Sequence, residues 1–239
     1  MPKCIQNSRN CKNCEHKFCI SQISLFSSLS QEEMSLISSE AITYSYKRGD
    51  TVFSQGDKAN HLYIVCKGKM KIKKYTVDGK EQILYILSDS DFIGAFNLLK
   101  EDRFNFTAEA IEDVDISMVS KDAFNSILIK NPDITLKVLE KAYERIIKVE
   151  SLVERLGTNS VDAKVAGLLL NLERDFGHKT NEGTLLRLSI NREEMGSYAG
   201  IARETMTRKL KLFQELGVIR LIGAKQILIM NKEALEEMN

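Results

Sequence analysis

The sequence predicts an α+β protein that combines an N-terminal antiparallel β jelly roll, a long helix and a C-terminal winged helix-turn-helix. Short runs rich in β-branched and aromatic residues, separated by glycine turns, occupy the segment from about Thr43 to Ser120. A narrow apolar stripe of helical spacing follows Pro132, and two helical patterns flank Gly200. The predicted parts are a cysteine-rich tail, the β-roll, the long helix and the helix-turn-helix, at residues 1–22, 23–131, 132–157 and 158–239.

The β-roll is predicted from turn residues that end each apolar run. Thr51–Phe53 precedes the turn Gln55-Gly56-Asp57, and Met70–Val77 precedes Asp78-Gly79, which is a strong two-residue hairpin signal. Many short strands with glycine turns are typical of a small antiparallel barrel or jelly roll. Such a roll can hold a ligand, or its interior can be filled so that it acts as a rigid connector. The strand pattern alone allows both.

The long helix after Pro132 has the spacing of a two-stranded coiled coil. Its apolar residues step alternately by four and three positions, at Ala142, Ile146, Val149, Val153 and Leu156. Gly157 ends the helix. The alternative is packing against the chain's own β-domain. We expect a dimer seam instead, because the stripe is narrow and charged residues flank it.

The C-terminal segment predicts a helix-turn-helix. Asn191 and Glu194 form a capping-box pattern at the start of the first helix, and Gly200 supplies the bend before the second. A hairpin, or wing, is expected after Gly217, with Gly223 at its turn. The second helix is expected from about residue 203 to residue 216.

The second helix of this motif has two distinct faces. At about 100° per residue, Met206, Leu210 and Phe213 share one arc, which we expect to face the core. The arc turned away from it is polar and mostly basic, as in helices that enter the major groove of DNA. The predicted DNA-contacting residues are Arg203, Glu204, Thr205, Thr207, Arg208, Lys209 and Lys211.

The net charge of +1 conceals a local excess of basic residues. Between residues 203 and 225 there are six bases and two acids, as expected of a nucleic-acid-binding surface. The chain has no catalytic motif such as His-Glu-x-x-His and only three histidines, so we expect no enzyme activity. No apolar run approaches the ~20 residues of a membrane span, and no signal peptide is evident, so we expect a cytoplasmic location.

Four of the five cysteines fall in the first nineteen residues, at Cys4, Cys11, Cys14 and Cys19. Clustered cysteines in a reducing compartment are more often metal ligands or redox groups than disulfides. Four thiolates suit an iron–sulfur cluster and equally a Cys4 zinc site, and the spacing alone does not separate the two. The fifth, Cys66, lies in a predicted strand, where we expect a small buried hydrophobic residue.

These motifs together resemble the CRP/FNR superfamily of transcription regulators, over about residues 20–235. The most specific part is the segment 203–208, Arg-Glu-Thr-Met-Thr-Arg, after Tyr198-Ala199-Gly200. The Gly49-Asp50 and Gly56-Asp57 turns, Gly68 and the segment Asp91–Gly94 also match. The resemblance implies a jelly-roll sensor domain of the cyclic-nucleotide-binding type, a dimerising helix and a winged helix-turn-helix.

The resemblance also implies partners and roles. A homodimer would bind double-stranded DNA at a near-palindromic site and act with RNA polymerase. Glu204 and Arg208 correspond to the shared base-contacting residues, and Arg203 matches the CRP branch, in which arginine contacts a further guanine. We therefore expect half-sites with a TGA-like core, which Arg203 shifts towards TGTGA. Ala202 departs from the pattern, because alanine cannot cap the recognition helix.

The resemblance argues against cAMP as the effector. Cyclic-nucleotide binders of the family have Gly-Glu followed by an Arg-Ser/Thr pair, but this chain has Gly94-Ala95 and an aromatic-rich segment after Arg103. An uncompensated buried phosphate would be costly. The tail resembles instead the FNR branch with its oxygen-labile [4Fe–4S] cluster. That branch takes its fourth ligand from a position near Ser117, so we expect Cys4 to replace it here.

The sequence therefore predicts a sequence-specific DNA-binding transcription regulator controlled by an N-terminal [4Fe–4S] cluster that senses oxygen, nitric oxide or redox state. One alternative keeps the DNA-binding role but gives the tail a structural zinc ion or a thiol switch. Another places a small-molecule effector in the β-roll.

Overall fold

The computed structural model describes residues 30, 32, 41–100, 103–158 and 160–238. The predicted cysteine-rich tail, residues 1–22, lies outside them. The chain divides into an N-terminal unit, Met1–Lys74 with Ile86–Ile146, and a C-terminal unit, Tyr75–Tyr85 with Ile147–Asn239. The backbone therefore crosses from one unit to the other three times, which the predicted boundaries did not anticipate.

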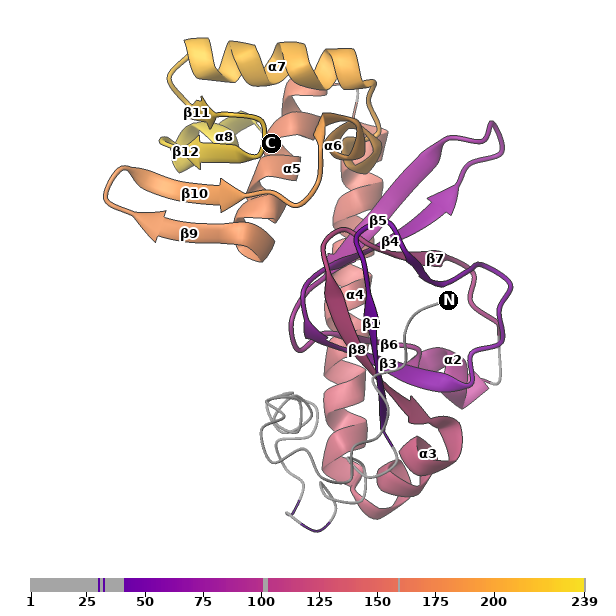
Figure 1. The fold of residues 1–239 in the computed structure, drawn as a ribbon. Helices are drawn as coiled ribbons and strands as arrows, with labels where there is room; N and C mark the ends of the chain where they lie inside the picture. Colours follow the sequence, from indigo (N-terminus) through magenta and orange to yellow (C-terminus); the bar gives the residue numbers. More distant parts are fainter. Residues whose placement is uncertain (1–29, 31, 33–40, 101–102, 159, 239) are drawn as a thin grey trace. The chain divides into compact units, whose positions relative to one another are not determined.

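The described part of the N-terminal unit is built on the predicted β-roll (Figure 1). Its strands are β1 Ile42–Tyr46, β2 Thr51–Phe53, β3 His61–Lys67, β4 Met70–Tyr75, β5 Glu81–Leu87, β6 Phe92–Ile93, β7 Thr107–Ala110 and β8 Val114–Ser120. They form two four-stranded sheets, with the orders β1-β8-β3-β6 and β2-β7-β4-β5. Consecutive strands thus alternate between the two sheets except for β4 and β5, which are neighbours in one sheet. This arrangement is that of a jelly roll.

The predicted hairpin between β4 and β5 is confirmed. Gly79 has a φ of +77°, which suits the turn because glycine has no Cβ to clash there. The amide of Thr76 donates to the carbonyl of Lys80 at 2.9 Å and closes the turn. Met70 and Ile72 of β4 are fully buried, and Lys71 and Lys73 are buried as well, so both faces of this strand are covered.

Two short helices and the first turns of a long one close the apolar core beside the roll. These are α2 Ala95–Lys100, α3 Lys121–Lys130 and α4 Pro132–Gly157. The hydroxyl of Ser120 caps α3 by accepting from the amide of Ala123. Phe124 of α3 and Ile134 of α4 are fully buried in the same cluster as Leu62 of β3.

The long helix α4 has the bounds predicted for it, and its apolar stripe is solvent-exposed. The exposed fractions are 53% for Ile146, 42% for Val149, 64% for Val153 and 37% for Leu156, whereas Ala142 is half-buried. The stripe is free to pair with another helix.

The C-terminal unit contains the predicted winged helix-turn-helix. Its elements are α5 Val161–Phe176, β9 Gly177–Thr180, β10 Gly183–Arg187, α6 Arg192–Ala199, α7 Arg203–Glu215, β11 Ile219–Ile222, β12 Gln226–Ile229 and α8 Lys232–Met238. The wing is larger than the predicted hairpin, because β9 and β10 extend it into a sheet of order β11-β12-β10-β9. Figure 1 shows α7 at the edge of this unit.

The first residues of β5, in the β4–β5 hairpin, are hydrogen-bonded to α6 within the C-terminal unit. The hydroxyl of Ser197 donates to the carbonyl of Glu81 at 2.6 Å and accepts from the amide of Ile83 at 3.2 Å. The side-chain amide of Gln82 donates to the carbonyl of Ser197 at 2.7 Å. These three hydrogen bonds explain why residues 75–85 belong to this unit.

Candidate nucleic-acid interface and sensor region

The first helix of the helix-turn-helix begins at the predicted capping box. The side-chain oxygen of Asn191 accepts from the amides of Glu193 and Glu194, at 2.9 and 3.0 Å. In return, the amide of Asn191 donates to the carboxylate of Glu194 at 2.8 Å. Both halves of the box are thus formed, which fixes where α6 starts. The helix ends at Gly200, whose φ of +68° is left-handed.

The second helix, α7, has the two faces predicted for it. Met206, Leu210 and Phe213 are at most 1% exposed, so the apolar arc faces the core. Ala202 precedes the helix in an extended conformation and makes no side-chain cap, as its residue type dictates. The hydroxyl of Thr207 donates to the carbonyl of Arg203 at 2.9 Å.

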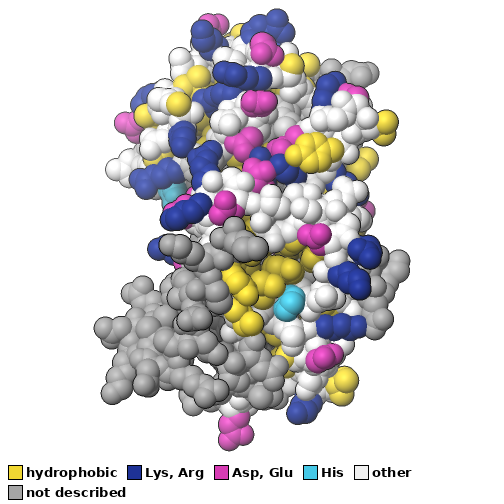
Figure 2. Space-filling model, turned by 45° about the vertical axis from the view of Figure 1, so that its right-hand side comes forward, with side chains coloured by type: hydrophobic (Ala, Val, Ile, Leu, Met, Phe, Trp, Pro, Cys, Tyr) yellow, Lys and Arg dark blue, Asp and Glu magenta, His cyan; other side chains and the backbone are white. Residues whose placement is uncertain are grey.

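The polar face of α7 presents charges to solvent. The exposed members of the predicted set are Arg203, Glu204, Thr207, Arg208 and Lys211. Within the part of the chain that the structure describes, the three cations of this set form no ion pair. The top of Figure 2, where Figure 1 places α7, shows dark blue Lys and Arg side chains with a few acidic ones between them. This face can therefore offer its full positive charge to a polyanion.

Two further residues of the predicted set, Thr205 and Lys209, are half-buried. The ammonium group of Lys209 lies 2.7 Å from a carboxylate oxygen of Asp162, in the first turn of α5. Its charge is thus used within the unit to join α7 to α5. This pair was not predicted, because the two residues are far apart in the chain.

One of the six basic residues between positions 203 and 225, Arg220, is paired with an acidic residue of the wing. The guanidinium of Arg220 on β11 forms an ion pair with Glu182, at 2.7 Å. Glu182 lies in the turn between β9 and β10, the hairpin that the sequence did not predict. The charge of Arg220 is therefore paired within the wing.

A largely buried carboxylate ties the end of α5 to the wing and to α8. Glu173, with a side chain 9% exposed, accepts from the hydroxyl of Thr184 at 3.0 Å and pairs with Lys232 at 2.9 Å and Lys179 at 3.4 Å. Burial acts to raise the pKa of Glu173, but these donors outweigh burial and the pKa lies below its usual value. Glu173 therefore supports the scaffold behind the recognition helix.

The segment of the β-roll that matches the nucleotide-binding motif is filled by aromatic rings. The ring of Phe104 is 1% exposed and stacks on that of Phe53, with centroids 3.8 Å apart. Tyr63 packs against both rings, and burial raises its pKa to about 12, so the phenol is neutral. Arg103, the motif's remaining cation, is exposed and donates to the carbonyl of Gly56 at 2.7 Å. Burying a cyclic phosphate among these rings would be costly without a cation to pair with it.

The position that the FNR branch uses for its fourth cluster ligand has an unexpected neighbour. Ser117 of β8 is 2% exposed, and its hydroxyl lies 2.9 Å from that of Thr43 and 3.1 Å from the thiol of Cys66. An irregular register between Val65 and Lys67 accompanies the placement of Cys66 beside this hydroxyl. Cys66 is half-buried, so the expectation of a buried residue at this position is wrong, and its thiol has a polar neighbour.

The four tail cysteines proposed as metal ligands lie outside the described residues. Among the described residues, no group of three or more His, Cys, Asp or Glu side chains is placed to hold a metal ion. In the same part of the chain, no helix is both long and apolar enough to cross a membrane.

Comparison with known proteins gives a consistent result. Residues 43–131 match the family model of the cyclic nucleotide-binding domain, and residues 163–238 match that of the Crp-like helix-turn-helix domain. The chain is 29% identical over 218 residues to the CRP-like cAMP-activated global transcriptional regulator of Mycobacterium tuberculosis, covering 90% of this chain and 96% of that relative. It is 23% identical over 208 residues to the anaerobic regulatory protein of Bacillus subtilis, covering 87% of each.

Among solved structures, FixK2 from Bradyrhizobium japonicum superposes with a TM-score of 0.74 at 23% sequence identity, covering 83% of this chain and 97% of FixK2. This likeness shows a shared fold. The two matched domains follow each other in the same order as the β-roll and the helix-turn-helix described above. The relatives match over most of the length of this chain. The chain belongs to the CRP/FNR family of DNA-binding transcription regulators.

Proposed function

We propose that this regulator binds a near-palindromic DNA site as a homodimer, with one α7 helix in the major groove of each half-site. The observation that supports this most strongly is the exposed polar face of α7, where Arg203, Arg208 and Lys211 have no ion-pair partner among the described residues. Glu204 and Arg208 contact bases shared across the family, and Arg203 contacts a further guanine. Lys211 contacts phosphate.

The apolar stripe of α4 supports the dimer. Ile146, Val149 and Val153 are each at least 42% exposed, and they recur at the spacing of a parallel two-stranded coiled coil. RNA polymerase is the further partner that membership of the family suggests, and the cytoplasm is the compartment in which such a partner is found.

DNA recognition is tested by fluorescence anisotropy on labelled duplexes. A palindrome with TGTGA half-sites should bind more tightly than a duplex in which the bases of both half-sites are scrambled. The affinity should also fall steeply as the salt concentration rises. The Arg203→Ala variant should lose the preference for TGTGA over half-sites that differ at the additional guanine. Equal affinity for all duplexes at all salt concentrations would rule out sequence-specific recognition.

For the signal, we propose a [4Fe–4S] cluster held by Cys4, Cys11, Cys14 and Cys19. Such a cluster supplies a redox centre that reacts with oxygen and nitric oxide. The donor set is chemically suitable, because four thiolates match the ligand number of the cluster. The buried aromatic cluster of Phe53, Tyr63 and Phe104 in the β-roll supports an effector outside the roll. The names of relatives do not decide the signal, because one is cAMP-activated and another is an anaerobic regulator.

The cluster is tested by anaerobic purification with a visible spectrum and assays for iron, sulfide and zinc. A broad absorption that bleaches in air, with iron and sulfide at about four per chain, is the expected result. Cys4→Ser should lose the iron, whereas Cys66→Ser should retain it. The reverse outcome would assign the fourth ligand to Cys66, beside Ser117. Zinc without iron would establish a structural zinc site, and no metal at all would leave a thiol switch.

A further inference from the structure

The last residue of the apolar stripe on α4, Leu156, also contacts the turn of the helix-turn-helix. A Cβ atom built on Gly200 would lie 2.3 Å from the Cδ2 atom of Leu156, so the leucine methyl group sits directly on the backbone of this glycine. Both residues belong to the C-terminal unit. Leu156 is the least exposed of the four exposed stripe residues, at 37% against 64% for Val153.

The glycine that Leu156 contacts lies in the turn between α6 and α7. Gly200 ends α6, and its amide donates to the carbonyl of Gly196. The turn is compact, because a Cβ atom on Gly196 would lie 2.7 Å from the carbonyl oxygen of Ile201. Arg203, the first residue of α7 and a proposed base-contacting residue, follows Gly200 by three positions. A displacement at Gly200 therefore moves the residues that enter the groove.

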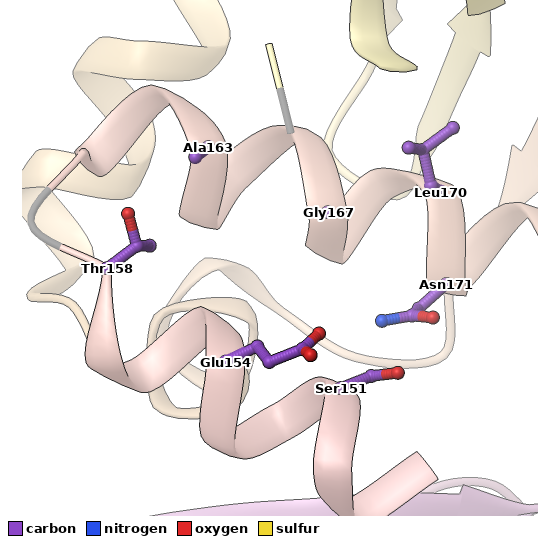
Figure 3. Close-up of a pocket in the computed structure, with 7 residues that line it drawn as sticks. All are labelled: Ser151, Glu154, Thr158, Ala163, Gly167, Leu170 and Asn171. Atoms are coloured by element: carbon purple, nitrogen blue, oxygen red, sulfur yellow. The ribbon is translucent and has the colours of Figure 1, made fainter. Parts of the chain in front are cut away.

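The contact between the C-terminal half of α4 and α5, both in the C-terminal unit, is less tightly packed than the contact of Leu156 with Gly200. A cleft of about 190 Å³ lies between α4 and the start of α5. Figure 3 shows Ser151 and Glu154 of α4 pointing towards Asn171 of α5 across this cleft, while Ala163 and Gly167 contribute little side chain. Side chains that line an open polar cleft can change position without displacing the opposite helix. In a close apolar contact, by contrast, a shift of one residue displaces the residue packed against it.

We propose that Leu156 is a positioning residue for DNA recognition, which supports the Gly200 turn with one side of its side chain and joins the dimer seam with the other. Closure of the seam around Leu156 then fixes the turn and with it the start of α7. This inference rests on the proposed dimeric DNA-binding function. It adds that the C-terminal end of the seam, at Leu156, also supports the Gly200 turn, whereas Val153 contributes to dimerisation alone.

The test compares Leu156→Ala with Val153→Ala in the full-length protein. Sedimentation velocity gives the dimerisation constant, and anisotropy on the palindromic duplex gives the DNA affinity of the dimer at protein concentrations where the dimer predominates. We expect Val153→Ala to weaken dimerisation and to leave the DNA affinity of the dimer unchanged. Leu156→Ala should lower that affinity about tenfold, which is about 1.4 kcal/mol. An unchanged dimer affinity in Leu156→Ala would overturn the proposal.

A double-mutant cycle with Gly200→Ala tests the contact itself. In the wild-type background, the added methyl group meets Leu156 and also strains the left-handed backbone, whereas in the Leu156→Ala background only the strain remains. The loss of thermal stability caused by Gly200→Ala should therefore be smaller in the second background. Additive losses would overturn the proposal. This measurement needs no DNA, so it separates a failure of the contact from a failure of the proposed function.

If Gly200→Ala does not fold, Leu156→Met takes its place, because methionine keeps the volume of leucine. Leu156→Met should restore most of the DNA affinity that Leu156→Ala loses. Equal affinities for the two variants would count against a supporting role for this side chain. Hydrogen exchange at the first amides of α7 should also be faster in Leu156→Ala than in Val153→Ala, and equal rates would contradict the proposal.

Discussion

The ring of Phe104 stacks on the ring of Phe53, with centroids 3.8 Å apart and planes inclined by 16°. Both side chains are buried, and they lie in the matched cyclic nucleotide-binding domain. Tyr63 and Phe106 extend the cluster. A buried aromatic cluster thus lies within the matched domain.

The stack predicts that cAMP does not bind in the roll. A ligand at about one hundred times its dissociation constant stabilises a protein by about 2.7 kcal/mol, so a binding protein would melt at a visibly higher temperature. We expect the thermal midpoint of this protein to be unchanged by millimolar cAMP. A clear upward shift would show that the rings move aside for the nucleotide.

The same stack should contribute strongly to stability. Phe104→Ala removes a fully buried ring and should lower the free energy of unfolding by about 3–5 kcal/mol. Phe106→Ala is the matched control, because Phe106 belongs to the same cluster but is only half-buried. Urea titration of both variants measures the difference. Equal losses would mean that Phe104 is not the centre of the cluster.

The recognition helix should be stabilised by an introduced cap. Ala202 already has the extended backbone of an N-cap residue, with φ −67° and ψ 149°, but it has no side chain that can accept from the helix amides. Ala202→Ser should raise the free energy of unfolding of the C-terminal unit by about 1 kcal/mol. Thermal melts followed by circular dichroism measure this gain, and Ala202→Val serves as a control that cannot cap.

The seam of α4 should respond to charge. Val153→Asp places a carboxylate on a stripe that we expect to face its own copy, so two like charges would meet in the dimer. The variant should be monomeric in sedimentation velocity at concentrations where the wild type is dimeric. Glu140→Ala, on an exposed part of the same helix outside the stripe, should leave the dimer intact. A dimeric Val153→Asp protein would place the interface elsewhere.

Glu173 gives stability a defined dependence on pH. Its pKa in the folded protein is below the ordinary value of 4.5, so the folded state favours the ionised form. The resulting stabilisation is complete above about pH 4.5 and is lost as the pH falls through the folded-state pKa. Glu173→Gln should therefore destabilise the protein at pH 7 and show a weaker loss of stability between pH 5 and pH 3, as measured by urea titration.

Glu236→Gln is the control for this measurement. Glu236 contacts the same lysine, Lys232, at 3.8 Å but is 56% exposed, so its removal should change the stability little. Identical pH profiles for the two variants would mean that Glu173 is not the group responsible.

Periodic patterns in the sequence predicted the two helices for which we propose DNA recognition and pairing with a second copy. The stripe on α4 and the two arcs of α7 follow from helical geometry, and the exposed and buried residues agree with them. Asn191 and Glu194 identified the start of α6 because a capping box is a local interaction. In each of these cases, the interacting residues are close in the sequence.

The features that the sequence did not reveal depend on long-range contacts or on backbone register. β9 is exposed along its whole length, so it has no alternation of apolar and polar residues that could mark a strand. The pair Lys209–Asp162 and the pair Cys66–Ser117 join residues on different elements. No spacing rule links such residues, and only the tertiary fold brings them together.

The hydrogen bonds of Ser197 with the β4–β5 hairpin make the C-terminal unit depend on a distant stretch of sequence. A fragment cut at Ile147 would lack Glu81 and Ile83, so the hydroxyl of Ser197 would have only water as a partner. Fusing this unit to a foreign sensor would therefore require transplanting the hairpin as well. The C-terminal unit is not one continuous stretch of sequence, because it includes residues 75–85 as well as residues 147–239. A chimaeric protein has to carry both segments.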